Sequence, residues 1–101
     1  MATSTPWGLS DSSKKYAPGI IFYSTPSHGG FHVSAKKFAS MPAALKKLAY
    51  PREGWFEEDA AWAAVALAFR EHFTHDEIVN AKSIVKHYYP EAFKEIFPNE
   101  K

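Results

Sequence analysis

The first third of the chain alternates short β-prone runs with turn residues. Lys14 to Ala17 reads as one strand, and Ile20 to Thr25 is rich in branched and aromatic residues typical of a second. Proline and glycine in Ala17-Pro18-Gly19-Ile20 fit a type II turn between them. Ser27 to Gly30 reads as the next turn, with glycines where left-handed backbone is wanted, and Phe31 to Val33 as a third strand. The pattern predicts a three-stranded antiparallel meander.

From Ser34 onward the apolar spacing becomes helical. The clearest helix is expected from about Phe56 to Arg70, where apolar residues recur at positions i, i+3, i+4 and i+7 from Trp62. Thr74 and Glu77 match a capping box, which predicts a helix start. The expected helical segments are 34–38, 42–49, 56–70, 74–88 and a short one from Pro90.

These elements predict an α+β fold, with an N-terminal three-stranded antiparallel β-meander packed against three to four helices. No linker or internal repeat divides the 101 residues, so we expect a single domain over residues 1–101. Residues 1–12 are rich in serine, threonine and proline and are expected to form a loosely ordered N-terminal arm. Trp7 is the expected anchor of this arm on the body of the domain.

The amino-acid composition limits the classes of protein to which this chain can belong. The chain is 46% hydrophobic and 16% aromatic, more aromatic than a core of this size usually needs, so some rings are expected at interfaces. It has no cysteine, which excludes disulfides and thiolate metal sites and suits a reducing compartment. No apolar run approaches the ~18 residues of a membrane span, and we expect no membrane partner and no cofactor.

The segment from His28 to His32 is the first candidate site. Two imidazoles flank paired glycines, whose backbone N–H groups can form an anion-binding nest. The alternative is a turn that needs glycine for its geometry and carries histidines at its polar rim. Alternation puts Phe31 and Val33 on one face and His32 on the other. No complete set of nucleophile, base and orienting group accompanies them, so contact with a partner is favoured over catalysis.

The segment from Gly54 to Asp59 is the second candidate. Three successive acids, Glu57, Glu58 and Asp59, point about 100° apart on a helix and cannot converge on one metal ion. They would suit the first turn of the expected helix, where the macrodipole favours anions. Together with Trp55 they also form an acidic, aromatic patch suited to a basic partner.

The sequence supports a metal site, a nucleic-acid-binding surface or a known catalytic motif less well. His72 and His75 could bind zinc with His28 or His32, but they bracket a helix break, so we expect no metal site. The lysine pairs at 14–15, 36–37 and 46–47 could contact nucleic acid, although a net charge of +1 favours solvated lysines. Neither a nucleophile-elbow pattern nor a P-loop pattern occurs.

Several segments together resemble an uncharacterised domain family found in proteins of bacterial plasmids, integrated elements and phages. The segments are Thr5-Pro6-Trp7-Gly8, Ala17-Pro18-Gly19-Ile20, Ser24 to Gly30, Gly54 to Asp59 with Trp62, and Tyr89 to Phe93. The resemblance runs from Thr5 to about Phe97 and implies no catalytic residues. It implies a mobile-element context, in which small proteins often bind and disable a host machine, and hence the cytoplasm of a bacterial host.

Three hypotheses follow. The first is a non-catalytic module that binds a host protein or complex and inhibits a defence system of the CRISPR or restriction type. Its expected contact residues are His28, Gly29, Gly30, Phe31, His32, Trp55, Glu57, Glu58 and Asp59. The second is a small hydrolase or nuclease-like enzyme using His28, His32 and an acid such as Glu58, and the third is a nucleic-acid-binding module. The shared pattern also predicts that residues 27–30 and 54–59 lie close together in the fold.

Overall fold

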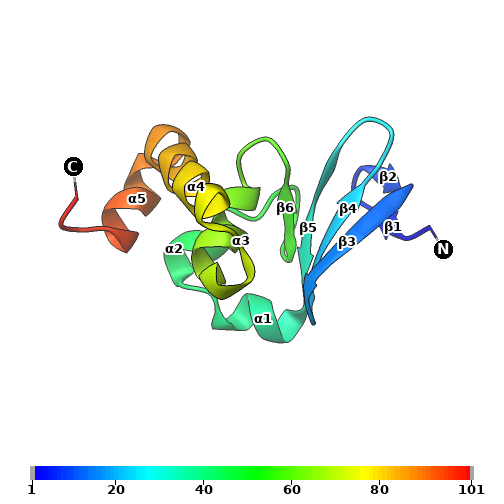
Figure 1. Cartoon of the computed structure of the whole chain (residues 1–101), viewed down its shortest axis with the longest axis horizontal. Coiled ribbons are helices and arrows are strands. Elements are labelled where there is room, and N and C mark those ends of the chain that lie inside the picture. Colours follow the sequence, from blue (N-terminus) through cyan, green and yellow to red (C-terminus); the bar gives the residue numbers. More distant parts are fainter. Residues whose placement is uncertain (1, 101) are drawn as a thin grey trace.

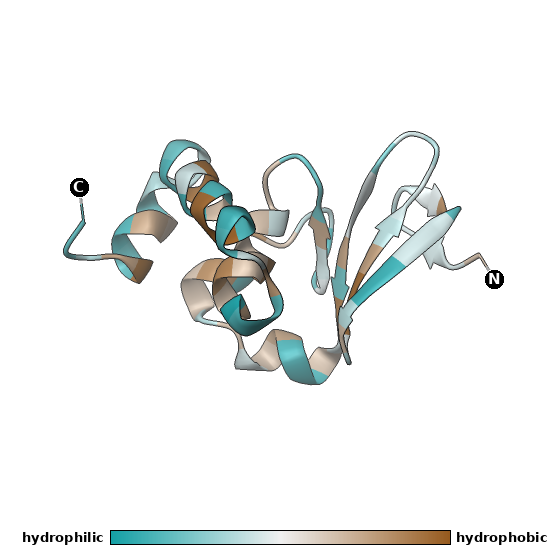
Figure 2. Ribbon diagram, in the orientation of Figure 1, coloured by the Kyte–Doolittle hydropathy of each residue, from teal (hydrophilic) through white to brown (hydrophobic). Residues whose placement is uncertain are grey.

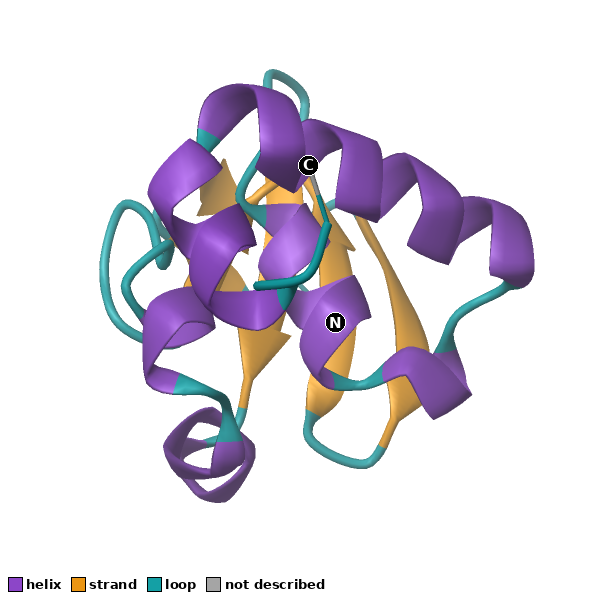
Figure 3. Ribbon diagram, turned by 90° about the vertical axis from the view of Figure 1, so that its left-hand side faces the viewer, coloured by secondary structure: helices purple, strands orange, loops and turns teal. Residues whose placement is uncertain are grey.

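The computed structural model of the chain, which describes residues 2–100, has antiparallel strands and helices segregated into two layers. The helices gather on one face of the main sheet, and a small N-terminal hairpin lies on the other side (Figures 1 and 3). The strands are β1 (Ser4–Thr5), β2 (Gly8–Leu9), β3 (Ser12–Ala17), β4 (Ile20–Ser24), β5 (Gly29–Val33) and β6 (Trp55–Glu57). The helices are α1 (Ala35–Ser40), α2 (Ala43–Lys46), α3 (Trp62–Ala68), α4 (His75–Tyr88) and α5 (Pro90–Ile96), with a 3₁₀ turn, η1, at Arg70–His72. The α+β class is confirmed.

The main sheet has one strand more than the sequence predicts. Its order is β3-β4-β5-β6, and all neighbouring pairs are antiparallel. The β3–β5 meander is confirmed, and the turn between β3 and β4 has Gly19 at φ +84°, as a type II turn requires. The added strand β6 pairs with β5, with Phe56 opposite Phe31.

The expected helix over 56–70 is therefore wrong in its first half. Phe56 is fully buried in the sheet, where an aromatic residue fits the pleated surface better than a helix start. The Glu57 carboxylate accepts hydrogen bonds from the backbone N–H groups of Asp59, Ala60 and Ala61, which follow it, at 3.0, 2.8 and 2.6 Å. Helix α3 begins only at Trp62, so the three acids precede it instead of forming its first turn.

The turn between β4 and β5 also differs from the prediction. It is closed by Thr25, whose backbone N–H and side-chain hydroxyl both donate to the carbonyl oxygen of His28, each at 2.7 Å. Gly29 and Gly30 already belong to β5, and neither has a positive φ. A left-handed backbone therefore does not explain why these two positions are glycine. The explanation lies in the atoms that pack closely against them.

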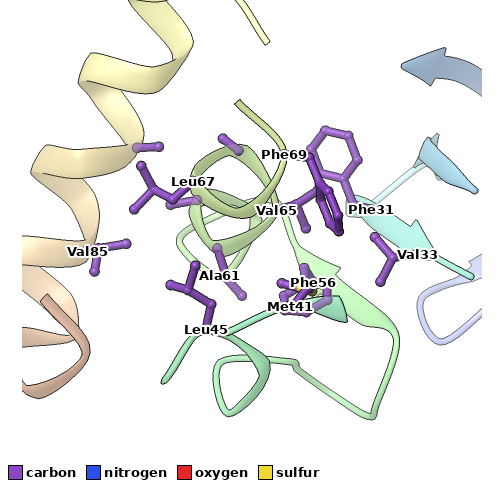
Figure 4. Packing of buried hydrophobic residues seen from close by; sticks show 14 of the residues in the cluster. Phe31, Val33, Met41, Leu45, Phe56, Ala61, Val65, Leu67, Phe69 and Val85 are labelled. Carbon is purple, nitrogen blue, oxygen red and sulfur yellow. The ribbon is translucent and has the colours of Figure 1, made fainter. Parts of the chain in front are cut away.

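Helix α3 is the centre of the hydrophobic core. Three of its alanines and Val65 are fully buried, because the helix has the sheet on one side and α2 and α4 on others. Phe31, Val33 and Phe56 reach it from the sheet, and Leu45 and Val85 from the helices (Figure 4). Figure 2 shows brown, apolar positions along α4, and its residues Ala81 and Val85 are fully buried in this core. Small side chains on α3 let all these elements approach closely.

Three helix starts agree with the sequence. The Ser34 hydroxyl accepts from the N–H of Lys37 at the start of α1. At the start of α4 the capping box of Thr74 and Glu77 is formed in both directions. The final helix begins at Pro90 as expected. Within residues 2–100 no helix is long and apolar enough to cross a membrane.

Candidate functional site

The two segments singled out in the sequence lie side by side. Gly30 pairs with Glu57 and His32 with Trp55 across β5 and β6, and the N–H of Glu58 donates to the carbonyl oxygen of Gly29 at 2.9 Å. The expected proximity of residues 27–30 and 54–59 is thereby confirmed. The junction presents two different surfaces, because successive residues of a strand face opposite sides of the sheet.

On the outer face, Gly30 leaves room for a tryptophan. A Cβ atom at Gly30 would lie 2.5 Å from the carbonyl oxygen of Phe56 and closer still to the ring of Trp7. Trp7, from the hairpin of β1 and β2, meets Trp55 edge to face with ring centroids 5.7 Å apart. Residues 4–9 of the expected N-terminal arm thus form a hairpin, and its tryptophan packs on the sheet.

Trp55 is the centre of this outer aromatic cluster, which we define as Trp7, Tyr23, His32 and Trp55. The rings of Tyr23 and His32 lie 5.9 and 4.5 Å from the Trp55 ring, and all four residues are half-buried. Burial in the cluster lowers the pKa of the His32 imidazole below its ordinary value, which favours the neutral ring at neutral pH. The cluster therefore fastens the hairpin to the sheet.

On the inner face, Gly29 leaves room for a carboxylate. A Cβ atom there would lie 3.0 Å from Oε1 of Glu58, 3.3 Å from the ring of Phe22 and 2.8 Å from the carbonyl oxygen of Tyr23. Glu58 therefore lies against the strand beside Phe22. The paired glycines each make a close approach possible, one on either side of the sheet.

The Glu58 carboxylate borders a cavity of about 490 Å³ between the sheet and α4. Its floor is made by rings of β3, β4 and β5, and its walls by the start of α3 and the start of α4. The lining residues are Tyr16, Phe22, Phe31, Glu58, Trp62, Phe73, Asp76, Glu77 and Asn80. Its volume falls within the range of roughly 300–1,000 Å³ typical of ligand pockets.

The three carboxylates of this aromatic–acidic cavity differ in what they contact. Glu77 accepts from the Tyr16 hydroxyl at 3.2 Å and from the Thr74 N–H at 2.9 Å. Burial raises the pKa of Tyr16 above its usual value, and the adjacent Glu77 raises it further, so the phenol keeps its proton. Glu58 and Asp76 are exposed, and within residues 2–100 their carboxylates have neither a hydrogen-bond donor nor an ion-pair partner.

The nine expected contact residues fall into separate places. Gly29, Gly30 and Phe31 are buried, and Phe31 packs against Tyr16, Phe22 and Phe73 in the core. His32 and Trp55 belong to the outer aromatic cluster, and Glu57 is occupied as a cap. The exposed members are His28, Glu58 and Asp59.

The residues of the enzyme and metal hypotheses are not assembled into one group. His32 lies on the outer face against Trp55, whereas Glu58 lies on the inner face beside Phe22. In the part of the chain that the structure describes, no three His, Asp or Glu residues are placed to hold a metal ion. His72 lies near Glu71, at 3.9 Å between Nε2 and Oε2.

Several of the paired lysines lie over aromatic rings. The ammonium groups of Lys14, Lys37 and Lys46 lie 4.8, 5.7 and 5.9 Å from ring centroids, above Tyr16, Phe69 and Phe38 respectively. Such contacts are worth about 0.5–1 kcal/mol at exposed sites.

The sequence interpretation missed most of the cavity. The helical spacing places Trp62 on the apolar face of an expected helix, and the capping box accounts only for the start of the next one. The only available signal was the acid pair at positions 76 and 77 of the expected helix start. Nothing in the spacing shows that this start packs opposite Glu58, since that depends on how α4 crosses the sheet.

Comparison with known proteins gives one finding. A family model described as a domain of unknown function, DUF7007, matches residues 1–101. No curated protein and no solved structure matches the chain.

Proposed function

We propose that this chain, which belongs to the DUF7007 family of domains of unknown function, is a non-catalytic protein-binding module that inhibits a host defence complex. The proposed contact face is the exposed edge formed by His28, Glu58 and Asp59, together with the rim of the aromatic–acidic cavity beside it.

One observation carries the binding role: the pairing of β5 with β6. It brings exposed residues of two distant segments close together, and one of these residues, Glu58, lines an open cavity with aromatic walls. Aromatic residues in concave surfaces contribute most of the energy in many protein interfaces. Two carboxylates without partners at this mouth favour a positively charged surface on the protein that binds.

The proposed defence role rests on the kinds of protein in which similar domains occur. The segment pattern of this chain resembles an uncharacterised domain found in plasmid, integrated-element and phage proteins. Small free-standing proteins from phages and mobile elements in general often bind and disable host machines. An inhibitor that acts by occupying a surface of such a complex needs no catalytic residues. We therefore propose a bacterial host protein or complex as the partner.

Affinity purification from a bacterial host tests this function. The full chain carrying an affinity tag is expected to capture one host protein in stoichiometric amount. The variant His28→Ala/Glu58→Gln/Asp59→Asn, altered only at exposed positions, is expected to lose at least ~10-fold of that capture, as interface centres do. Quantitative mass spectrometry of the eluates provides the measurement.

The matched control is Glu53→Gln/Glu95→Gln, which removes the same two negative charges at exposed positions elsewhere. It should capture the partner as the unaltered chain does. Equal capture by the contact-face variant, or no stoichiometric host protein from any of several hosts, would contradict the proposal.

A further inference from the structure

The aromatic–acidic cavity combines ring surfaces with unpaired negative charge. Trp62 is half-buried at its wall, and within residues 2–100 its ring contacts neither another aromatic ring nor a cation. Tryptophan gives the strongest cation–π attraction of the aromatic side chains. Phe22 and Phe73 add apolar surface on the floor and the opposite wall.

The two unpaired carboxylates come from different segments that line the cavity. Glu58 comes from the segment before α3 and Asp76 from the first turn of α4. An ionised carboxylate is an acceptor only, so each can be satisfied by an N–H donor from a ligand. Glu77 cannot turn freely toward such a ligand, because Thr74 and Tyr16 already hold its two oxygens.

Within residues 2–100, the chain's own cations leave Glu58 and Asp76 without an ion pair. Lys14 is the lysine that reaches the lining, with its ammonium 4.8 Å from the centroid of the Tyr16 ring. Among the described residues it forms no ion pair with Glu58 or Asp76. The ring contact shows that the aromatic lining accepts an ammonium group, while the two carboxylates still lack one.

We propose that the aromatic–acidic cavity receives a lysine or arginine side chain of the partner protein. The hydrocarbon stem packs on Phe22 and Phe73, the charged head lies against Trp62, and its N–H groups donate to Glu58 and Asp76. This proposal rests on the proposed binding function and names the chemistry that the partner must present. Lysine and arginine suit it because both join an apolar stem to a cation rich in N–H donors.

Titration of the chain alone with side-chain analogues tests the proposal. The ligands are N-acetyl-lysine methylamide, N-acetyl-arginine methylamide and the neutral N-acetyl-norleucine methylamide, with 1,4-diaminobutane as a free polyamine. The three tryptophan indole N–H signals report by NMR, since Trp62 lies at the cavity and Trp7 and Trp55 lie on the outer face. We expect saturable shifts of Trp62 alone, with a Kd of about 1 mM for a charged analogue and none for norleucine.

A second experiment removes the negative charges of the two unpaired carboxylates. Glu58→Gln/Asp76→Asn is expected to weaken binding of the charged analogues roughly 10-fold, because charge-assisted hydrogen bonds are lost. Glu53→Gln/Glu95→Gln should bind as the unaltered chain does. Equal binding by norleucine, unchanged binding by the cavity variant, or no saturable Trp62 shift would overturn the proposal.

Two further outcomes separate the alternatives. Tighter binding of 1,4-diaminobutane than of both amino-acid analogues would assign the cavity to a free polyamine and overturn the partner side chain as its occupant. Because the titration needs no partner, its failure leaves the capture of a host protein through His28, Glu58 and Asp59 intact. Failure of that capture with a positive titration would instead overturn the binding function.

Discussion

Gly30→Ala is expected to destabilise the domain by about 3 kcal/mol, which lowers Tm by roughly 12–24 °C for a domain of this size. The added methyl group would lie 2.5 Å from the carbonyl oxygen of Phe56 and 2.9 Å from the Cα of Glu57. Both are backbone atoms of β6, so strand pairing must open to relieve the contact. Urea unfolding monitored by tryptophan fluorescence measures the change.

Two variants identify the cause of this loss. Trp7→Ala in the Gly30→Ala background removes the ring contact but leaves the backbone contacts, so we expect little recovery of stability. Ser27→Ala, at an exposed turn position nearby, should stay within about 0.5 kcal/mol of the unaltered chain. Full recovery in the double variant would show that Trp7 alone, and not the approach of β6, requires glycine.

Glu57→Ala is expected to cost about 2–3 kcal/mol, a large effect for a residue whose neighbours are exposed acids. Its carboxylate accepts three backbone N–H groups at the entry to α3, including that of the fully buried Ala61. Without it the Ala61 N–H is left unsatisfied in the core. Thermal unfolding of the variant measures the loss.

The neighbouring acid is the natural comparison. Glu58→Ala removes a carboxylate that has no partner among residues 2–100, so its effect on stability should stay within about 0.5 kcal/mol. Glu57→Gln keeps one acceptor oxygen and is expected to lie between the other two variants. Equal losses at positions 57 and 58 would contradict the assignment of Glu57 as the cap and Glu58 as a surface residue.

The sequence predicted the elements whose signals are local. The β3–β4 turn follows from Pro18 and Gly19, and the α4 start from Thr74 and Glu77, because each signal acts within four residues. β6 was missed because Trp55 and Phe56 precede a run with helical spacing, and three residues are too few to show a period of two. Its strand conformation comes from pairing with β5, which is a long-range contact.

The candidate site was predictable only in outline. Residue pattern and resemblance pointed to His28–His32 and to Gly54–Asp59, and these segments do meet. The individual roles were not visible, because alternation along β5 and β6 divides the residues between two faces and the core. The role of the two glycines was assigned to backbone torsion, whereas the structure shows that they admit Trp7 and Glu58. The cavity wall formed by α4 depends on how this helix packs against the sheet, and the spacing of residues along the sequence does not show that packing.

The central claim is that the cavity rim is the contact face. Amide hydrogen exchange tests it most directly, when the chain alone is compared with the chain bound to its captured host partner. We expect slowed exchange on binding at residues 58–61 and 73–77, the two walls that carry Glu58 and Asp76. The hairpin of β1 and β2 and helix α5 should exchange as in the free chain. Protection confined to the outer aromatic cluster or to α5, with both cavity walls unchanged, would contradict the account.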